Sequence, residues 1–378
     1  MQICICRVRV EYVKLEEICT IVSGGTPSRS KPNYWNNGNI PWIKIKDMKS
    51  KYIDSAEEFI TEEGLNNSST KMLKRGTILY SIFATLGEVG ILKIDACTNQ
   101  AIAGLSLKED SNILKEYLYY YLKSKKKDVN NLGRGVAQNN INLSLLRKFK
   151  IPVIPLCQQK KIIEVLDNVS STINNYEREL ALLDELVKAR FVEMFGDPVS
   201  NSKDLPVQKM NNVAPICQYD GSFEESVWLL NLDMVESQTG RIINYNIVSK
   251  DEIGGSVCTF DENNVLYSKL RPYLNKVVIP DGKGYATSEL VPLRPDPKII
   301  NRIYLAYLLR SNEFVEMIKE KVAGAKMPRV SMSDFREFNV PVPLLELQNQ
   351  FASFVQEIDK SRLLELLAIK HIKSLLKD

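Results

Sequence analysis

The sequence has a single histidine, no paired cysteines and no long apolar run, and each absence excludes a class of protein. Because the only histidine is His371, mechanisms that need two imidazoles are excluded and a zinc site loses its commonest ligand. The seven cysteines are scattered without a Cys-x-x-Cys pair, which favours free thiols in a reducing cytosol over disulfides or a metal site. Residues 1–10 contain no apolar run long enough for a signal peptide or a membrane span. We therefore predict a cytoplasmic protein without a membrane segment.

A strong excess of charge of either sign is also missing, since 50 lysines and arginines stand against 46 acidic residues. Bulk composition therefore does not by itself indicate a nucleic-acid partner. The charge is unevenly distributed: residues 12–150 hold 21 basic and 14 acidic residues, whereas residues 204–343 hold 16 and 18. If both parts bind the same polyanion, the second must do so through a local cluster of cations.

Through the middle of the chain, apolar residues recur at alternating spacings of four and three, without an intervening proline or glycine. This heptad pattern predicts one long helix over residues 157–195, ended by Gly196-Asp197-Pro198. At 1.5 Å per residue the helix would span roughly 55–60 Å, longer than most helices within a domain. We interpret it as a strut between two folded parts. Its apolar positions are Ile162, Leu166, Val169, Ile173, Tyr176, Leu180, Leu183 and Val187.

The chain also contains an internal repeat with an offset of 189 residues. With this shift, residues 149–153 (FKIPV) fall on residues 338–342 (FNVPV), and Gln159 falls on Gln348. With small gaps the globular parts repeat too, so that residues 42–48 match 228–234. The order along the chain is therefore domain, long helix, domain, long helix.

The second long helix has an imperfect apolar seam, because Arg362 and Glu365 occupy core positions. The neighbouring Leu363 and Leu366 must supply the apolar contacts at these points. Two helices with complementary stripes can pair antiparallel. We therefore predict an α+β fold, in which two α/β domains with a mainly β core are separated by two long antiparallel helices that form a coiled coil, with an internal pseudo-twofold repeat. The predicted segments are an N-terminal extension (1–11), a first domain (12–156), a central helix (157–197), a second domain (198–343) and a C-terminal helix (344–378).

Three segments of the first domain gather polar and basic side chains. Residues 23–32 form a loop that contains glycines, prolines, hydroxyl side chains and two cations. The loop could bind a phosphate, or it could be a solvated loop without a ligand. It is not a nucleotide P-loop, because the Gly-Lys-Ser/Thr of that motif is missing. Residues 40–48 alternate apolar and charged residues, which predicts a strand with Lys44 and Lys46 on its exposed face. Residues 133–142 offer amides and a guanidinium that suit purine edges, although a polar helix-capping loop explains the same composition.

In the second domain, residues 267–276 and 324–329 form the local basic and amide-rich clusters. The latter segment is the repeat equivalent of residues 135–140, which favours a binding role over a capping role for both loops, although some of these side chains would contact only phosphate. The candidate DNA-binding residues are Thr26, Arg29, Lys31, Lys44, Lys46, Arg134, Gln138, Asn139 and Asn140 in the first domain and Lys269, Arg271, Tyr273, Asn275, Lys276, Lys326 and Arg329 in the second.

On these features the chain resembles the specificity subunit of Type I restriction–modification systems over residues 12–378. The resemblance depends on residues 23–27 (SGGTP), residues 40–43 (IPWI), the repeated Ile/Val-Pro-Val followed by Gln159 and Gln348, and residues 195–198 (FGDP). It implies two target-recognition domains, each reading one half of a bipartite asymmetric site on double-stranded DNA. It also implies that the helices set the unread spacer and dock two methyltransferase subunits, with restriction/translocase subunits in the full complex.

The same resemblance implies a subunit without catalytic activity and without a bound cofactor or metal, since S-adenosylmethionine, ATP and Mg would be used by the partner subunits. Apolar side chains on the flanks of the two helices are the candidate docking residues, because a single coiled-coil partner cannot cover them. They are Ile163, Leu182, Leu186, Phe191, Leu364 and Leu367.

Two alternatives remain open from the sequence. A fused methyltransferase or nuclease would combine recognition with catalysis, but the Asn/Asp-Pro-Pro-aromatic motif of an adenine methyltransferase is missing, and residues 280–291 do not complete a nuclease motif. A coiled-coil scaffold that never meets DNA is the other alternative. The steep salt dependence of DNA binding would distinguish that scaffold from a DNA reader.

Overall fold

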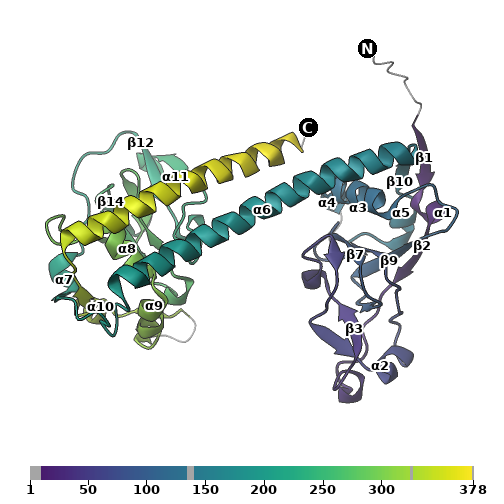
Figure 1. The fold of residues 1–378 in the computed structure, drawn as a ribbon, viewed down its shortest axis with the longest axis horizontal. Coiled ribbons are helices and arrows are strands. Elements are labelled where there is room, and N and C mark those ends of the chain that lie inside the picture. Colours follow the sequence, from purple (N-terminus) through teal and green to yellow (C-terminus); the bar gives the residue numbers. More distant parts are fainter. Residues whose placement is uncertain (1–9, 134–139, 324–326, 377–378) are drawn as a thin grey trace, which may run out of the picture. The chain divides into compact units, whose positions relative to one another are not determined.

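The computed structural model describes residues 10–133, 140–323 and 327–376 (Figure 1). The chain divides into two compact units, Met1–Thr172 and Ile173–Asp378, which we call the N-terminal unit and the C-terminal unit. The division falls inside the long helix α6 (Leu156–Phe195), whereas the sequence places that helix in a segment of its own. The segment boundaries expected from the sequence therefore stay a prediction.

Two sheets form the β core of the N-terminal unit. The five-stranded sheet has the order β2-β9-β6-β7-β4 and is antiparallel except for its β4–β7 pair, and the three-stranded sheet has the order β5-β3-β8. Strands β6 and β7 are buried along their whole length, in keeping with a sequence that is apolar apart from the hydroxyls of Tyr80 and Ser81. The strands are β2 (Cys19–Ser23), β3 (Ile40–Ile43), β4 (Tyr52–Ile53), β5 (Glu58–Ile60), β6 (Ile78–Ser81), β7 (Val89–Leu92), β8 (Cys97–Thr98) and β9 (Ile102–Leu107).

Short helices and one antiparallel pair of strands from the two ends of the domain complete the N-terminal unit. Strand β1 (Glu11–Lys14) pairs antiparallel with β10 (Lys150–Val153), which immediately precedes α6. Helix α3 (Lys115–Ser124) packs its buried face on the core through Tyr117, Leu118 and Leu122. The remaining elements are α1 (Leu15–Ile18), η1 (Pro32–Tyr34), η2 (Ile45–Asp47), α2 (Glu62–Asn66), α4 (Lys126–Gly133) and α5 (Leu143–Arg147).

The strand predicted over residues 40–48 is wrong in its second half. Strand β3 ends at Ile43, and the chain turns into the short helix η2. The cause is Asp47, whose carboxylate accepts a hydrogen bond from the backbone N–H of Lys44 at 2.7 Å and so stabilises a turn in place of a strand. Lys44 and Lys46 consequently do not share an exposed strand face.

The C-terminal unit repeats this plan. Its sheets have the orders β13-β12-β17-β14 and β16-β15-β18, and the parallel pair β12–β17 corresponds to the parallel pair β3–β8. Strand β11 (Val207–Lys209) pairs with β21 (Asn339–Pro341) as β1 pairs with β10. The other strands are β12 (Ser226–Leu230), β13 (Asn246–Ser249), β14 (Val257–Phe260), β15 (Val265–Ser268), β16 (Val277–Val278), β17 (Gly284–Thr287), β18 (Leu290–Leu293), β19 (Val322–Ala323) and β20 (Arg329–Val330).

The helices of the C-terminal unit cover one end of its core. The buried faces of α8 (Arg302–Arg310) and α9 (Asn312–Lys319) share one apolar cluster with the last turns of α6 and the first turns of α11 (Leu345–Leu375). In the repeat, α8 corresponds to α3. The short elements are α7 (Met210–Val213), η3 (Leu232–Met234), η4 (Lys250–Glu252), η5 (Pro272–Leu274) and α10 (Met332–Arg336).

A buried glutamine fastens each long helix to its own domain. Gln159 is fully buried, accepts a hydrogen bond from the Leu114 N–H at 2.8 Å, and donates to the carbonyls of Asn112 and Ile154 at 2.7 and 2.8 Å. Its repeat partner makes the same three kinds of bond at the start of α11. Gln348 accepts from the Asn301 N–H at 2.8 Å and donates to the carbonyls of Ile299 and Pro343 at 3.1 and 2.8 Å. The repeat seen in the sequence is therefore a repeat of structure.

The long helix predicted over residues 157–195 is confirmed, since α6 runs from Leu156 to Phe195 and Gly196 follows it with a φ of +73°. In the C-terminal unit, α6 and α11 pair antiparallel (Figure 1). Glu177 bonds Lys373 at 3.0 Å, Asp184 bonds Arg362 at 2.6 Å, and the Phe191 and Phe351 rings lie 5.5 Å apart, so the residue numbers run in opposite directions. The predicted α+β fold class with its antiparallel helix pair and internal repeat is confirmed.

Glu365 interrupts the apolar seam of this helix pair. One of its carboxylate oxygens is buried without a hydrogen-bond partner among the described residues. Burial, followed by repulsion from Glu179, raises the pKa of Glu365 above its ordinary value of 4.5. The ionised form is therefore a cost to the folded state, and this cost disappears when the carboxyl is protonated.

We expect Glu365→Leu to raise the free energy of unfolding by about 1 kcal/mol at neutral pH, because it removes an unsatisfied carboxylate and continues the seam. The gain should shrink as the pH falls through the raised folded-state pKa towards the ordinary value of 4.5, and it should be smallest below 4.5, where the carboxyl is protonated in both states. Chemical denaturation at pH 7 and pH 4 measures the difference. The exposed Glu357→Leu on the same helix is the control, and an equal gain there would contradict the seam explanation.

Candidate nucleic-acid interface

The loop of residues 23–32 in the N-terminal unit is built around Arg29. Its guanidinium lies 3.5 Å from the centre of the Trp35 ring and 5.2 Å from that of Trp42, and it forms an ion pair with Glu58. The Trp42 indole N–H donates to the Gly25 carbonyl at 3.0 Å, which ties the loop to strand β3. Contact with both indoles restricts the movement of the Arg29 guanidinium, while its side chain stays 54% exposed.

The other predicted residues of this loop are also exposed and already make contacts. Thr26 donates to the Gln100 side-chain oxygen at 2.5 Å, and the Lys31 ammonium lies 2.9 Å from the Tyr34 hydroxyl. The Tyr34 contact raises the pKa of Lys31, so that this lysine remains charged at neutral pH. The loop thus presents a hydroxyl and two cations to solvent.

Two glutamates hold the cations of the adjacent turn. Lys44 forms an ion pair with Glu58, which it shares with Arg29, and Lys46 forms one with Glu57. Burial raises the pKa of Glu58, but the cations outweigh this effect, and its pKa is lowered overall. The Lys44 side chain is only 18% exposed, whereas Lys46 is 55% exposed. Of the two lysines, Lys46 is the more accessible to a polyanion.

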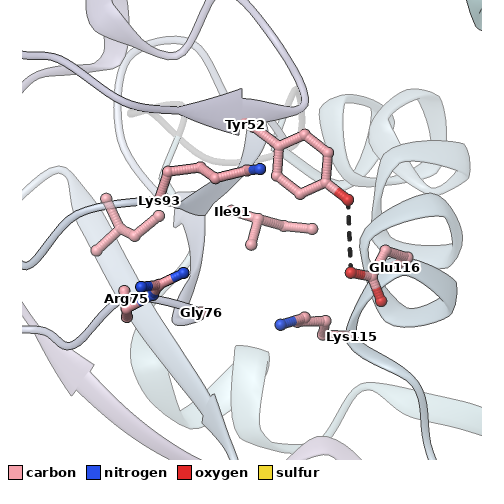
Figure 2. Close-up of a pocket in the computed structure, with 8 residues that line it drawn as sticks. Tyr52, Arg75, Gly76, Ile91, Lys93, Lys115 and Glu116 are labelled. Carbon is pink, nitrogen blue, oxygen red and sulfur yellow. Dashed lines mark hydrogen bonds between the residues drawn. The ribbon is translucent and has the colours of Figure 1, made fainter.

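Sequence reasoning missed a pocket of about 200 Å³ in the N-terminal unit (Figure 2). Three cations line it from three different elements: Arg75 precedes β6, Lys93 follows β7, and Lys115 begins α3. Tyr52 closes one side, where its hydroxyl donates to Glu116 at 3.5 Å and its ring lies 4.5 Å from the Lys93 ammonium. The described salt bridges include neither Lys93 nor Lys115. No sequence motif joins these residues, because only the sheet brings them together.

In the C-terminal unit the fold joins the two clusters that the sequence places far apart. An antiparallel bridge connects Leu270 to Arg329, and the Arg271 N–H donates to the Pro328 carbonyl at 2.8 Å. Arg329 is exposed, and its guanidinium donates hydrogen bonds of 2.7 and 3.2 Å to the Glu289 carboxylate. This contact lowers the pKa of Glu289. The equivalent bridge of the N-terminal unit connects Phe83 to Asn140. Both domains therefore bring the same two loops together.

Residues 271–275 form a tight turn whose members face different ways. Arg271 and Asn275 both have left-handed backbones, with φ values of +50° and +49°, on either side of η5. Arg271 and Tyr273 are exposed, the latter by 42%, and Lys269 is half-buried. The turn therefore presents a guanidinium and a phenol next to Arg329.

Two residues predicted to bind DNA in this turn are directed inward, and we withdraw them. Asn275 is 5% exposed and donates to the Arg310 carbonyl at 2.9 Å. The Lys276 ammonium donates to the Leu232 carbonyl at 2.6 Å, and burial lowers its pKa. Both side chains are held by backbone of their own unit, which composition alone does not reveal. The predicted residues Arg134, Gln138, Asn139 and Lys326 lie outside the described residues, and Asn140 is described and half-buried.

Most of the candidate docking residues are exposed on the long helices. The exposed fractions are 52% for Leu182, 47% for Leu186, 70% for Leu364 and 52% for Leu367, and Ile163 is partly buried against the core of the N-terminal unit. Phe191 is an exception and a correction, since it is only 3% exposed and stacks on Tyr304 with ring centres 5.6 Å apart. It lies on the core side of α6 and is not available to a partner.

A family model described as the type I restriction modification DNA specificity domain matches residues 7–184 and 233–374. The chain belongs to this family. It is 36% identical over 172 residues to the specificity subunit of the type I restriction enzyme EcoR124I/EcoR124II of Escherichia coli, a match that covers 44% of this chain and 42% of that protein. It is 24% identical over 375 residues to the MjaIX specificity subunit of Methanocaldococcus jannaschii, covering 91% of this chain and 85% of that protein.

Solved structures share the fold of this specificity subunit. The S subunit of a type I restriction–modification system from M. genitalium matches with a TM-score of 0.55 and 14% identity, covering 100% of this chain and 97% of that one. A chain from a structure of type I system assembly and conformational transition matches with a TM-score of 0.57 and 15% identity, covering 97% and 95%. Within the described ranges, none of the helices has the length and apolar character to span a bilayer, and His, Cys, Asp and Glu form no group of three that could hold a metal.

Proposed function

We propose that this specificity subunit reads a bipartite, asymmetric site on double-stranded DNA, one half-site with each domain, and that it has no catalytic activity of its own. The duplicated pair of loops carries the proposal: Leu270 bridges Arg329 in one unit as Phe83 bridges Asn140 in the other. Guanidinium and amide groups on paired loops suit base edges in a major groove, and neighbouring lysines suit phosphates. Two copies of one reader in a single chain match a site with two different halves.

The proposed DNA contacts are the described candidates that remain once Asn275 and Lys276 are withdrawn, together with candidates outside the described ranges. Arg29, which lies over the Trp35 ring, and Arg271, beside Arg329, are the strongest candidates for base reading, because a planar guanidinium suits the edge of a guanine. The other proposed contacts are Thr26, Lys31, Lys44, Lys46, Asn140, Lys269 and Tyr273, with Arg134, Gln138, Asn139 and Lys326 retained from the sequence.

The partners follow from the same proposal. Two methyltransferase subunits would dock on the exposed leucines of the long helices, Leu182, Leu186, Leu364 and Leu367, with Ile163 at the domain end of α6. Restriction/translocase subunits would complete the cytoplasmic complex. S-adenosylmethionine, ATP and Mg would be used by those partners, and the chain itself would contribute recognition and spacing.

Exchanging residues 12–149 for the first domain of another family member is expected to change one half-site and leave the other half-site and the spacer unchanged. The expectation follows because each domain has its own core and its own pair of loops. Mapping methylated adenines in cells that carry the chain and its partner subunits measures both halves at once. A change in both half-sites, or methylation by the purified chain alone, would contradict the proposal.

The cation-lined pocket of Figure 2 would contact the DNA backbone. We expect the double variant Lys93→Ala/Lys115→Ala to weaken binding by about tenfold for every sequence and to lower the slope of log K against log salt by about 1–2, since two phosphate contacts are lost. Titrations of specific and non-specific duplexes at several salt concentrations measure both effects. Lys14→Ala, which removes an exposed lysine of β1, is the matched control. A loss confined to the specific duplex would contradict a phosphate role.

A further inference from the structure

In the N-terminal unit, a partly buried lysine connects the recognition domain to α6. Lys51 is only 16% exposed and forms an ion pair with Asp167 of α6. Its ammonium also lies 4.7, 5.3 and 5.8 Å from the ring centres of Tyr120, Tyr52 and Tyr119, so that aromatic faces surround the charge. The Tyr120 hydroxyl donates to the same carboxylate. Burial raises the pKa of Asp167, but Lys51 and Tyr120 outweigh it and the pKa is lowered, so this contact is fully ionised at neutral pH.

In the C-terminal unit, an arginine makes a contact of the same kind. Arg241 forms an ion pair with Asp184 of α6, and Asp184 also accepts from Arg362 of α11 at 2.6 Å. Arg362, whose side chain is 9% exposed, bonds Asp359 at 2.5 Å as well. The charged residue that interrupts the predicted seam is therefore the centre of a network that joins both helices to the domain.

The backbone before Arg241 is shaped for this contact. Gly240 has a φ of +67°, and a Cβ at this position would lie 1.8 Å from the Val277 carbonyl oxygen. A residue with a side chain would push the loop away from β16, and Arg241 would move with it. Close approach of the loop to the body of the domain is thus part of how Arg241 reaches α6.

The two cations come from corresponding loops, but the helices that they contact do not correspond in the repeat. Lys51 follows residues 42–48 and Arg241 follows their repeat, residues 228–234, so that the same loop of each domain supplies the cation. The carboxylates are not repeat partners, because the offset of 189 places Asp167 on Gln356. Asp167 lies on the helix that follows its domain, whereas Asp184 lies on the helix that precedes its domain, so the two contacts are not copies of one ancestral contact.

Each cation provides a second point of attachment for its domain. Gln159 holds the start of α6, and Asp167 lies eight residues further along, about 12 Å at 1.5 Å per residue. A domain held at one point can rock about it, whereas a domain held at two separated points keeps a fixed angle to the helix. In the C-terminal unit, Gln348 and the buried aromatic cluster around Tyr304 hold the domain at one end of the helix pair, and the Asp184–Arg362 network adds a contact further along α6.

We propose that Lys51 and Arg241 are positioning residues that fix the angle between each recognition domain and its helix, and thereby the number of unread base pairs that the protein accepts between half-sites. This inference rests on the proposed reading of a bipartite site. Adding one base pair moves a half-site by about 3.4 Å along the duplex. A rigidly held domain rejects that displacement, whereas a rocking domain tolerates it. The two cations would therefore affect spacer discrimination and leave the half-site sequences unchanged.

The variants Arg241→Met and Lys51→Met test the proposal without leaving a carboxylate unpaired. Asp184 keeps Arg362, and Asp167 keeps the Tyr120 hydroxyl. The full chain would be expressed with its methyltransferase partner subunits, and methylated sites would be mapped across the genome. We expect both half-site sequences to be unchanged, with methylation at spacers one base pair longer or shorter rising at least about tenfold relative to the native spacer.

Arg190→Met, which removes an exposed pair with Glu193 on the same helix, is the control and should keep the native spacer. Thermal unfolding of each purified complex checks that it is folded. The proposal is overturned if folded variants methylate only at the native spacer, or if they lose methylation at every spacer. Should a methionine variant fail to fold, Arg241→Gln and Lys51→Gln carry the same expectation. If the wild-type complex methylates a continuous sequence without an unread spacer, the proposed function itself is wrong. That outcome is seen in the wild-type complex alone, so it is distinguishable from a failure of the proposal for Lys51 and Arg241.

Discussion

Replacing Gln159 with leucine is expected to lower the free energy of unfolding of the N-terminal unit by about 3–5 kcal/mol. The side chain is fully buried and satisfies three backbone groups, the Leu114 N–H and the carbonyls of Asn112 and Ile154. Leucine has a similar volume but no polar atoms, so all three groups would stay buried without partners. Each such group costs about 1–3 kcal/mol, carbonyls less than N–H groups, which sets the expected range.

Chemical denaturation of the full chain, with hydrogen exchange to locate the loss, measures this effect. Gln158→Leu is the matched control, because the neighbouring side chain is exposed on the same turn of α6. Gln348→Leu should place an equal loss in the C-terminal unit, where the repeat partner makes three bonds of the same kind. A loss of less than about 1 kcal/mol in both variants would show that the glutamines do not lock the helices to their domains.

Replacing Phe195 with alanine is expected to destabilise the C-terminal unit by about 3–5 kcal/mol. Phe195 is 2% exposed, and its ring lies 4.7 Å from that of Tyr304 and 5.6 Å from that of Phe351. These rings belong to α6, α8 and α11, so the lost contacts are those between the helix pair and the domain. The surrounding helices are held at their ends, which limits how far they can collapse into the cavity.

The control for this variant is Val192→Ala, whose side chain is 50% exposed on the same stretch of α6. It should change the free energy of unfolding by no more than about 0.5 kcal/mol. Hydrogen exchange should show faster exchange at the start of α11 and in α8 for the Phe195 variant, with the N-terminal unit unchanged. Equal losses of unfolding free energy in the two variants would show that this aromatic cluster does not specifically stabilise the unit.

Several features followed from the sequence because they depend on local pattern. The apolar spacing predicts the long helix to within one residue of its observed start at Leu156, since a single amphipathic helix needs no information beyond its own residues. The repeat predicts the second helix and the antiparallel pairing. Gln159 and Gln348, which match across the repeat, are the buried residues that bond the start of each long helix to its domain.

Other features depended on which elements the fold brings together. The sequence predicts a strand through Lys44 because the alternation continues, but the Asp47 carboxylate bonds the backbone and turns the chain. Asn275 and Lys276 have the composition of a binding loop, yet carbonyls from elsewhere in their unit hold both side chains. Phe191 continues the apolar pattern of the exposed leucines, and only the position of Tyr304 shows that it faces the core.

By itself, the sequence determined the fold class, the duplicated organisation and the family, because periodicity and repeats are properties of neighbours along the chain. The tertiary structure alone decided which cations are accessible. It also gathered Arg75, Lys93 and Lys115 around one pocket, and it placed Lys51 and Arg241 against carboxylates of α6. These partners come from residues tens of positions apart, and side-chain charge acts over a few ångströms of space irrespective of separation along the chain.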